Sequence, residues 1–355
     1  MFAFNLGSIV AKALLQLIIT TEQEVAMQQD NIFQLIRPRT LAALAACTLP
    51  ISMVQASNLP APAIQFYGKA EVQLAHTDKG FMRYAEQGTQ LDMPFSRFGL
   101  RGEQQLNDYL TAFFTYEVDV RGFDEANTQT PFSARNTFVG IKGGFGQLIA
   151  GRNDTRLKTS EGLVDLYNET SGDIAQILPG QDRLGDSLTY ISPRLAGFEL
   201  SVTYVLGQDN ELQQGKDGVA VSLAYGDRNL NSQPYYITLT RAQSLNGLDA
   251  SRLVWQQKLS DFTLGVLLQY SEEAEGERSG SGGYISVQYP FGNWVPKLQL
   301  GRDTSSLRQR SAANHYTTGV DYLFNSQSKA YVYLTQLVLT DATDTSVVAG
   351  LQYRF

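Results

Sequence analysis

Apolar and polar positions alternate along most of this chain, from Ala63 to the last residue. Leu200 and Val202 alternate with Glu199 and Ser201, and the same period of two recurs in many later segments. Such alternation is typical of β-strands that have one apolar and one polar face. Because no segment after residue 57 shows a long 3.6-residue period, the pattern predicts an all-β fold.

The alternating runs have a common length and regular connections. We count about sixteen runs of about ten residues, the length that a tilted strand needs to cross a bilayer. Short turns, such as 143–145 and 290–292, alternate with long connectors, such as 77–95 and 153–185. A sheet in hydrocarbon must close on itself, because all of its backbone groups have to be paired.

We therefore predict a sixteen-stranded antiparallel transmembrane β-barrel with short periplasmic turns and long extracellular loops. The expected strands are roughly 64–76, 96–105, 110–121, 133–142, 146–152, 186–192, 197–206, 217–226, 233–243, 249–259, 261–271, 281–289, 293–302, 313–324, 328–340 and 345–355.

The last strand ends the chain on aromatic residues. Leu351, Tyr353 and Phe355 are expected to face lipid, whereas Gln352 and Arg354 face the interior. Aromatic rings are favoured at the membrane interface. We interpret Tyr353 and Phe355 as part of this aromatic girdle and as an assembly signal, read by the outer-membrane assembly machinery.

Composition narrows the protein class further. Tyr and Phe number 18 each beside 31 Gly, and the charged fraction is 18%. The mean hydropathy is slightly polar, which argues against a bundle of membrane helices. The net charge of −7 argues against nucleic-acid binding. The only cysteine, Cys47, lies near the front, so the rest of the chain can cross an oxidising compartment without forming disulfides.

Residues 1–56 are interpreted as a leader. Two arginines precede a short apolar stretch at 40–54, and Ala56 ends a motif that signal peptidase accepts, which together indicate a signal peptide. We expect the true start at Met27, cleavage after Ala56, and a barrel domain over 57–355. Residues 1–26 are then either a wrongly assigned upstream start or an anchor. Leu44–Cys47 resembles a lipobox, but apolar sequence continues beyond it, which favours an unmodified cysteine.

Three segments carry a family resemblance. "SRFGLRGEQQL" (96–106), "RNTFVGIKGGFGQLIAGRNDT" (135–155) and "DRLGDSLTYISPRLAGFELSVTYV" (182–205) resemble the general porins of Gram-negative bacteria, and the likeness extends from Ile64 to Phe355. The resemblance implies a 16-stranded barrel, a homotrimer in the cell outer membrane, and a third extracellular loop folded into the lumen. We name this loop, residues 153–185, loop 3.

The resemblance also implies a constriction with a basic wall. Period two places Arg97 and Arg101 on the interior face of the second strand, and Arg135 is interior if Phe138 faces lipid, as the family motif implies. Arg97 and Arg135 match two arginines that line the constriction in this family, whereas Ile191 stands at the position of a third.

Loop 3 is expected to supply the acidic side of the constriction. Facing acids and bases would set up a transverse field across a narrow, water-filled pore, through which small polar solutes pass more readily than apolar ones. The acidic candidates are Glu161, Asp165, Glu169, Asp173 and Asp182, with Asp186 at the end of the loop.

The predicted function is passive diffusion of ions and small hydrophilic solutes. A sugar- or anion-selective channel is the closer alternative, and the inward Tyr67, Phe113 and Tyr236 leave an aromatic sugar track open. An adhesive barrel without a pore is not separable from a channel by sequence. A barrel enzyme would need a nucleophile and a base, but the mature chain has only His76 and His315 as histidines.

No cofactor and no metal site are expected, because two histidines without cysteine make a poor zinc site. The expected partners are two further copies of the chain, the lipid bilayer with its lipopolysaccharide, the assembly machinery, and the small solutes and ions that pass.

Overall fold

A computed structural model describes residues 63–120, 131–208, 210–213 and 215–355. The expected start at Met27, the cleavage after Ala56 and the lipobox-like Leu44–Cys47 lie outside the described residues. Within the described ranges, no helix has the length and apolar character that a membrane crossing requires.

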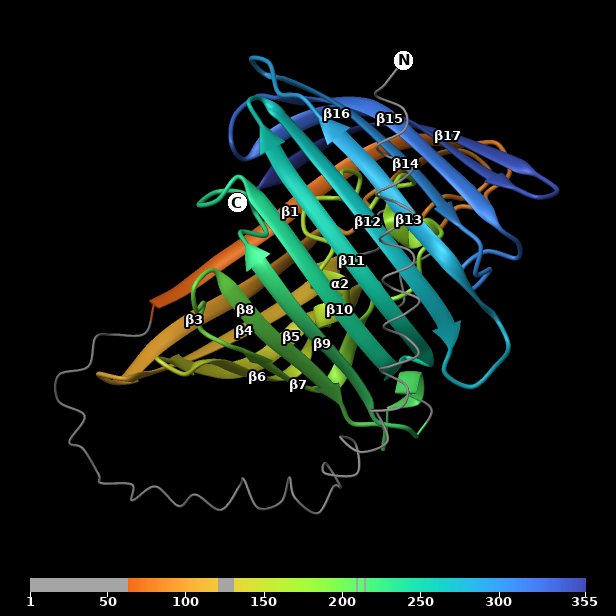
Figure 1. Cartoon of the computed structure of the whole chain (residues 1–355). Coiled ribbons are helices and arrows are strands. Elements are labelled where there is room, and N and C mark those ends of the chain that lie inside the picture. The colour runs from red at the N-terminus through yellow and green to blue at the C-terminus, as the bar shows by residue number, and fades with distance from the viewer. Residues whose placement is uncertain (1–62, 121–130, 209, 214) are drawn as a thin grey trace, which may run out of the picture. The chain divides into compact units, whose positions relative to one another are not determined.

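Almost all regular structure in the described residues is antiparallel strand (Figure 1). The strands are β1 (Ala63–Thr77), β2 (Gly88–Asp92), β3 (Arg97–Asn107), β4 (Leu110–Val120), β5 (Phe132–Gly143), β6 (Gly146–Asp154), β7 (Arg183–Ile191), β8 (Phe198–Val205), β9 (Gly218–Gly226), β10 (Tyr235–Leu245), β11 (Leu248–Leu259), β12 (Phe262–Glu273), β13 (Ser279–Gln288), β14 (Trp294–Asp303), β15 (Ala313–Leu323), β16 (Ser328–Leu339) and β17 (Thr343–Arg354). The helical segments are α2 (Arg156–Thr159), η3 (Ile174–Gln176) and η4 (Glu211–Gln213).

The strands form one closed sheet. β1 pairs with β17 on one side, and on the other side it pairs with β3 over Ala63–Lys69 and with β2 over Gln73–Thr77. Because β2 and β3 occupy successive positions along β1, they form one interrupted stave, and the barrel has 16 strands. The predicted fold class and all sixteen expected strands are confirmed. β2 was not expected, because its sequence GTQLD is short and has little apolar character.

The last residue completes the closure. Backbone hydrogen bonds join the Phe355 nitrogen to the Gly68 oxygen at 3.1 Å and the Gly68 nitrogen to the Phe355 oxygen at 3.0 Å. The Phe355 ring lies 5.5 Å from the Phe66 ring, between ring centres, on the outer face. These contacts leave no free strand edge between the two ends of the barrel, as a sheet in hydrocarbon requires.

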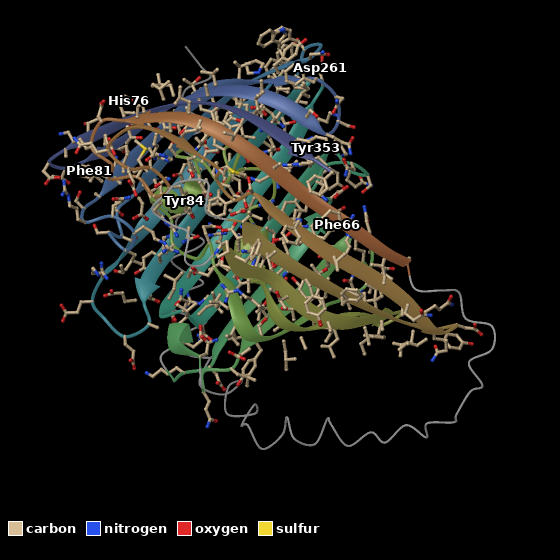
Figure 2. The ribbon with its side chains drawn as sticks, turned by 180° about the vertical axis from the view of Figure 1, so that it is seen from behind. Phe66, His76, Phe81, Tyr84, Asp261 and Tyr353 are labelled. Carbon is tan, nitrogen blue, oxygen red and sulfur yellow. The ribbon has the colours of Figure 1, made fainter. Side chains whose placement is uncertain are left out.

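Alternation separates the two faces of the sheet as predicted. In β17, Val347 and Leu351 are 46% and 54% exposed, whereas Ser346 and Val348, on either side of Val347, are buried. Phe66 and Tyr353 both point away from the barrel interior (Figure 2). The outer face is thus apolar and aromatic, the composition that lipid contact requires.

One extracellular connection is a two-residue turn. β10 and β11 are joined by Asn246 and Gly247 alone, which have positive φ angles of 55° and 72°. Two residues with positive φ form the tight hairpin whose twist matches that of paired strands, and Asn-Gly is the favoured sequence for it. The extracellular edge of the barrel therefore extends less far here than where long loops connect the strands.

Candidate pore constriction

Loop 3 folds into the barrel and packs against the inner face of one wall (Figure 1). Its α2 segment begins at the Thr155 cap, whose hydroxyl accepts from the Lys158 nitrogen, and lies against β8, β9 and β10. Apolar residues of the loop then fill the space beside β11 to β16. This cluster contains Val164, Ile174, Ile177 and Leu178 of the loop together with Val254, Leu267, Tyr284 and Leu337 of the wall. The expected inward folding of loop 3 is confirmed.

Polar wall residues hold the backbone of the loop. The Gln299 amide oxygen accepts from the Leu166 nitrogen at 2.8 Å, and its amide nitrogen donates to the Gly172 oxygen at 2.9 Å. Arg252 donates to the Leu157 oxygen at 2.6 Å. Fully buried Gln299 and Arg252 therefore satisfy backbone groups that the irregular loop leaves unpaired.

His315 is also part of this anchorage. Its Nε2 lies 3.0 Å from the Ser171 oxygen, and its Nδ1 lies 2.8 Å from the Tyr284 hydroxyl. The side chain is fully buried between β15 and loop 3. One ring nitrogen therefore contacts the loop backbone, and the other contacts Tyr284 of the wall.

The tip of loop 3 reaches the opposite wall through Glu169. Its carboxylate lies 2.6 Å from Arg97 Nη1, 2.8 Å from Arg135 Nη2 and 2.8 Å from Lys69 Nζ. Glu169 has a positive φ of 69°, which is uncommon for a residue with a side chain. The ion pairs and the Asp173 carboxylate, which accepts from the Glu169 nitrogen at 2.8 Å, hold this backbone in place.

The basic wall contains acids of its own. Glu117 on β4 lies 2.8 Å from Arg135 Nε and 3.8 Å from Arg97 Nε, and it accepts from the Tyr67 hydroxyl at 3.1 Å. Asp119 lies 3.8 Å from Arg135 Nη1. We call Lys69, Glu71, Arg97, Glu117, Asp119, Arg135 and Glu169 the constriction cluster; its three cations face four acids at contact distance.

Burial changes the charge that loop 3 presents. Burial raises the pKa of Glu161 to about 7, although Lys158 and Arg252 act in the opposite direction. Burial likewise raises the pKa of Asp165 and Asp173. Burial would also raise the pKa of Glu169, but Lys69, Arg97 and Arg135 together hold it well below its usual range. Glu169 is thus the loop acid whose ionised form the fold favours most strongly.

The structure does not bring all predicted site residues together. Arg101 faces the interior below the cluster, where its guanidinium donates to Gln65 at 2.8 and 3.0 Å. Asp182 pairs with Arg308 at 3.3 Å. Asp186 is exposed on β7, and within the described residues no contact joins it to the basic wall. Of the acids predicted on loop 3, Glu169 is therefore the one that pairs with Arg97 and Arg135.

Two sequence expectations need correction or completion. Phe138 faces the lumen rather than lipid, since it pairs with Thr115 and its ring lies 6.3 Å from that of Phe113. A bulge places one extra residue on β5 opposite Tyr116 and Val118, so Arg135 and Phe138, three apart, both face inward.

Lys69 and Glu117 were not predicted as site residues, although period two already assigns them to the inner face. The strand register that brings them to Arg97 cannot be determined from a single sequence.

Comparisons with known proteins agree with this architecture. Over residues 40–342 the sequence matches the family described as Gram-negative porin. It is 25% identical to outer membrane porin F of Escherichia coli (strain K12) over 93% of this chain and 100% of that protein. It is 26% identical to the major outer membrane protein P.IB of Neisseria meningitidis serogroup B, over 83% of this chain and 91% of that protein.

A solved structure, an anion-selective porin from Comamonas acidovorans, shares the fold. Its TM-score is 0.67 at 19% identity, with 83% of this chain and all of that chain covered. The family match spans most of the sequence, and the closed barrel with its inserted loop has the matching architecture, so this chain belongs to the Gram-negative porin family.

Proposed function

We propose that this porin sorts small hydrophilic solutes by charge where the tip of loop 3 meets the basic wall. As an outer-membrane porin, it is a channel for the passive diffusion of small solutes. The observation that carries the proposal is the contact of Glu169 with Lys69, Arg97 and Arg135 across the barrel interior.

The constriction cluster would act through fixed charges of both signs. Such charges order water and polar groups strongly where the dielectric constant is low. A polar solute can exchange hydrogen bonds with these groups as it passes, whereas an apolar solute would have to strip ordered water without replacement. The wall acids Glu117 and Asp119 moderate the positive potential of the arginines, so ion preference depends on the balance within the cluster.

The reversal potential in a salt gradient tests this role of the cluster. Arg97→Gln and Arg135→Gln should each shift the preference of the channel toward cations, and Glu169→Gln should shift it toward anions. Arg241→Gln is the matched control, because Arg241 is exposed on β10 and pairs with Asp249 and Glu272 rather than with the cluster. Equal reversal potentials in all variants would remove the cluster from the conducting path.

We also propose that the working form is a homotrimer. An outer membrane protein of the same fold, OmpT of Vibrio cholerae, is described in a trimer form. An apolar groove of about 480 Å³ on the outer face of β3 to β7, lined by Phe114, Val139 and Leu188 among others, is compatible with such packing. Lipopolysaccharide contact, and recognition of Tyr353 and Phe355 by the assembly machinery, belong to the same proposal.

The matched relatives are porins rather than enzymes, and we propose that this chain has no catalytic activity. His76 Nδ1 lies 2.8 Å from the Thr89 hydroxyl, and His76 Nε2 lies 3.7 Å from Asp78. This grouping has the residue types of a hydrolytic triad, but it is exposed at the rim. Phospholipid hydrolysis that is lost in His76→Ala would overturn this part of the proposal.

A further inference from the structure

The lumen wall below the constriction cluster carries an aromatic patch. Tyr67 on β1, Phe113 on β4 and Phe138 on β5 all point inward and are partly exposed. The other described tyrosines with inward rings, such as Tyr284, Tyr331 and Tyr333, are buried against loop 3 or its anchors. A polar channel wall does not need exposed aromatic rings, and such exposed apolar patches mark binding sites.

Glycines on the neighbouring strands fix the position of two rings. Gly99 lies opposite Tyr67, and a Cβ atom at Gly99 would stand 2.9 Å from that ring. Gly140 lies opposite Phe113, and a Cβ atom there would stand 2.5 Å from its ring. Each ring therefore lies against bare backbone at these glycines, where a side chain would displace it. The Phe138 ring stands at 80° to that of Phe113.

Two cations lie beside these rings. The Arg101 guanidinium carbon is 5.1 Å from the centre of the Tyr67 ring, and the hydrogen bonds of this guanidinium go to the neutral Gln65 side chain. Lys142 Nζ is 5.8 Å from the centre of the Phe113 ring. Lys142 also pairs with Glu103 at 2.6 Å, but both side chains are exposed, so an incoming anion can compete for it.

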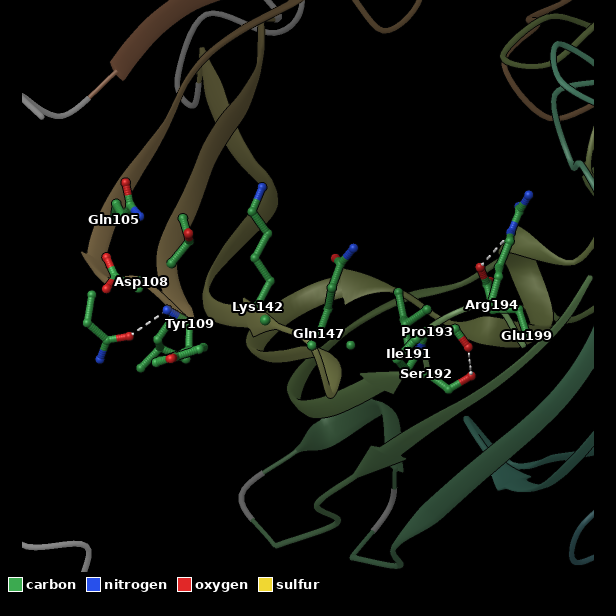
Figure 3. A pocket seen from close by; sticks show the side chains of 16 residues that line it. Gln105, Asp108, Tyr109, Lys142, Gln147, Ile191, Ser192, Pro193, Arg194 and Glu199 are labelled. Atoms are coloured by element: carbon green, nitrogen blue, oxygen red, sulfur yellow. Dashed lines mark hydrogen bonds and ion pairs between the residues drawn. The ribbon is translucent and has the colours of Figure 1, made fainter. Parts of the chain in front are cut away.

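The patch borders a wide mouth. A cavity of about 630 Å³ opens at the periplasmic end beside it, lined by Lys142, Gln105 and Gln147 among others. Lys142 extends from the wall into this space, between Gln105 and Gln147 (Figure 3). A small solute that passes the constriction cluster therefore meets Arg101, Lys142 and the open rings before it leaves.

We propose that this patch is a subsite for small aromatic carboxylates. The ring of the solute would stack on Phe113 and Phe138 or on Tyr67, and its carboxylate would bind the nearby cation, Lys142 or Arg101, since cationic side chains bind carboxylates well. The subsite rests on the proposed channel function and refines it. Binding is weak enough for release, as conduction requires.

Inhibition of the chloride current in planar bilayers tests the subsite. Benzoate and cyclohexanecarboxylate have similar size and the same charge, but only benzoate has a π-face. Benzoate should inhibit at a concentration roughly two- to tenfold lower, the ratio that corresponds to one aromatic contact. Phe113→Leu and Phe138→Leu should each reduce this difference, and Arg101→Gln should weaken inhibition by both anions.

Phe114→Leu is the matched control, because Phe114 is the next residue on β4 and packs with Tyr116 on the outer face. It should leave the difference intact. Equal inhibition by the two anions in a channel that conducts potassium chloride normally would overturn the subsite alone. So would a loss of glucose permeation in Phe113→Leu, because the rings would then serve sugars. A protein that does not conduct at all would overturn the channel function as well.

Discussion

At the scale of single residues, Glu169 holds the candidate constriction together. Removing one partner of a buried ion pair is strongly destabilising, by about 3–5 kcal/mol, because the remaining charge is left uncompensated. Here one carboxylate serves three cations, so its loss affects both the charge of the lumen and the position of the loop tip. The strained φ of Glu169 is consistent with a position that its contacts determine.

Ionisation of Glu161 should make the ion preference of the channel depend on pH. Its pKa is raised from 4.5 to about 7 by burial, so the folded protein holds a proton there that the unfolded chain has already lost. Docking of loop 3 is therefore strongest below pH 4.5 and weakens as the pH rises through about 7. As Glu161 ionises, the lumen gains a negative charge, and cation preference should increase between pH 6 and 8, a window of about one unit on either side of that pKa.

Reversal potentials measured across this pH range test the prediction. Glu161→Gln should flatten the titration, whereas Glu275→Gln, which removes an exposed loop acid paired with Lys216, should not. A titration that survives in Glu161→Gln would assign the effect to another group.

At this scale the sequence placed the arginines on the correct face of the sheet but did not predict which residues they pair with. Period two identified the inward face that carries Arg97 and Arg101. These two arginines have different surroundings, because Arg97 pairs with Glu169 whereas Arg101 donates to Gln65. The interpretation of Phe138 failed because a bulge inserts a residue without changing the hydrophobic pattern. The six loop acids could not be ranked, because burial by the opposite wall decides which of them stay ionised.

At the scale of elements, loop 3 depends on a few polar anchors. Gln299→Leu keeps a side chain of similar volume but removes two hydrogen bonds to the loop backbone, each contributing about 1 kcal/mol. We expect more frequent current fluctuations in single-channel recordings, with the barrel still folded. Gln336→Leu on β16 is the control, because Gln336 faces outward. Equal noise in both variants would show that Gln299 does not restrain the loop.

The elements themselves were largely predictable from the sequence. Strand positions follow from alternation and turn residues, because lipid and water impose opposite demands on the two faces. β2 and the 3₁₀ segment η3 were not predicted, since neither has a periodic pattern of its own. The path of loop 3 was taken from the family resemblance, and its physical basis is the apolar cluster with β11 to β16, which no local pattern reveals.

At the scale of the whole molecule, the barrel depends on the seam between its first and last strands. A Cβ atom at Gly68 would lie 2.7 Å from the Arg97 backbone oxygen and 2.4 Å from the Phe355 ring. Gly68→Ala should therefore strain the seam, at a cost of about 1–3 kcal/mol. The folded form should lose its compact gel mobility in detergent at a lower temperature. Gly144→Ala, with open space around the added methyl group, should behave as wild type; equal behaviour of the two variants would contradict this view of the seam.

The central claim is that a closed sheet in the outer membrane surrounds a water-filled passage that loop 3 narrows. Conductance of the purified protein in a planar bilayer tests it most directly. We expect stepwise, ohmic currents in potassium chloride, with closures in groups of three for a trimer. A correctly folded protein that inserts without any conductance, under every voltage and salt condition, would contradict it.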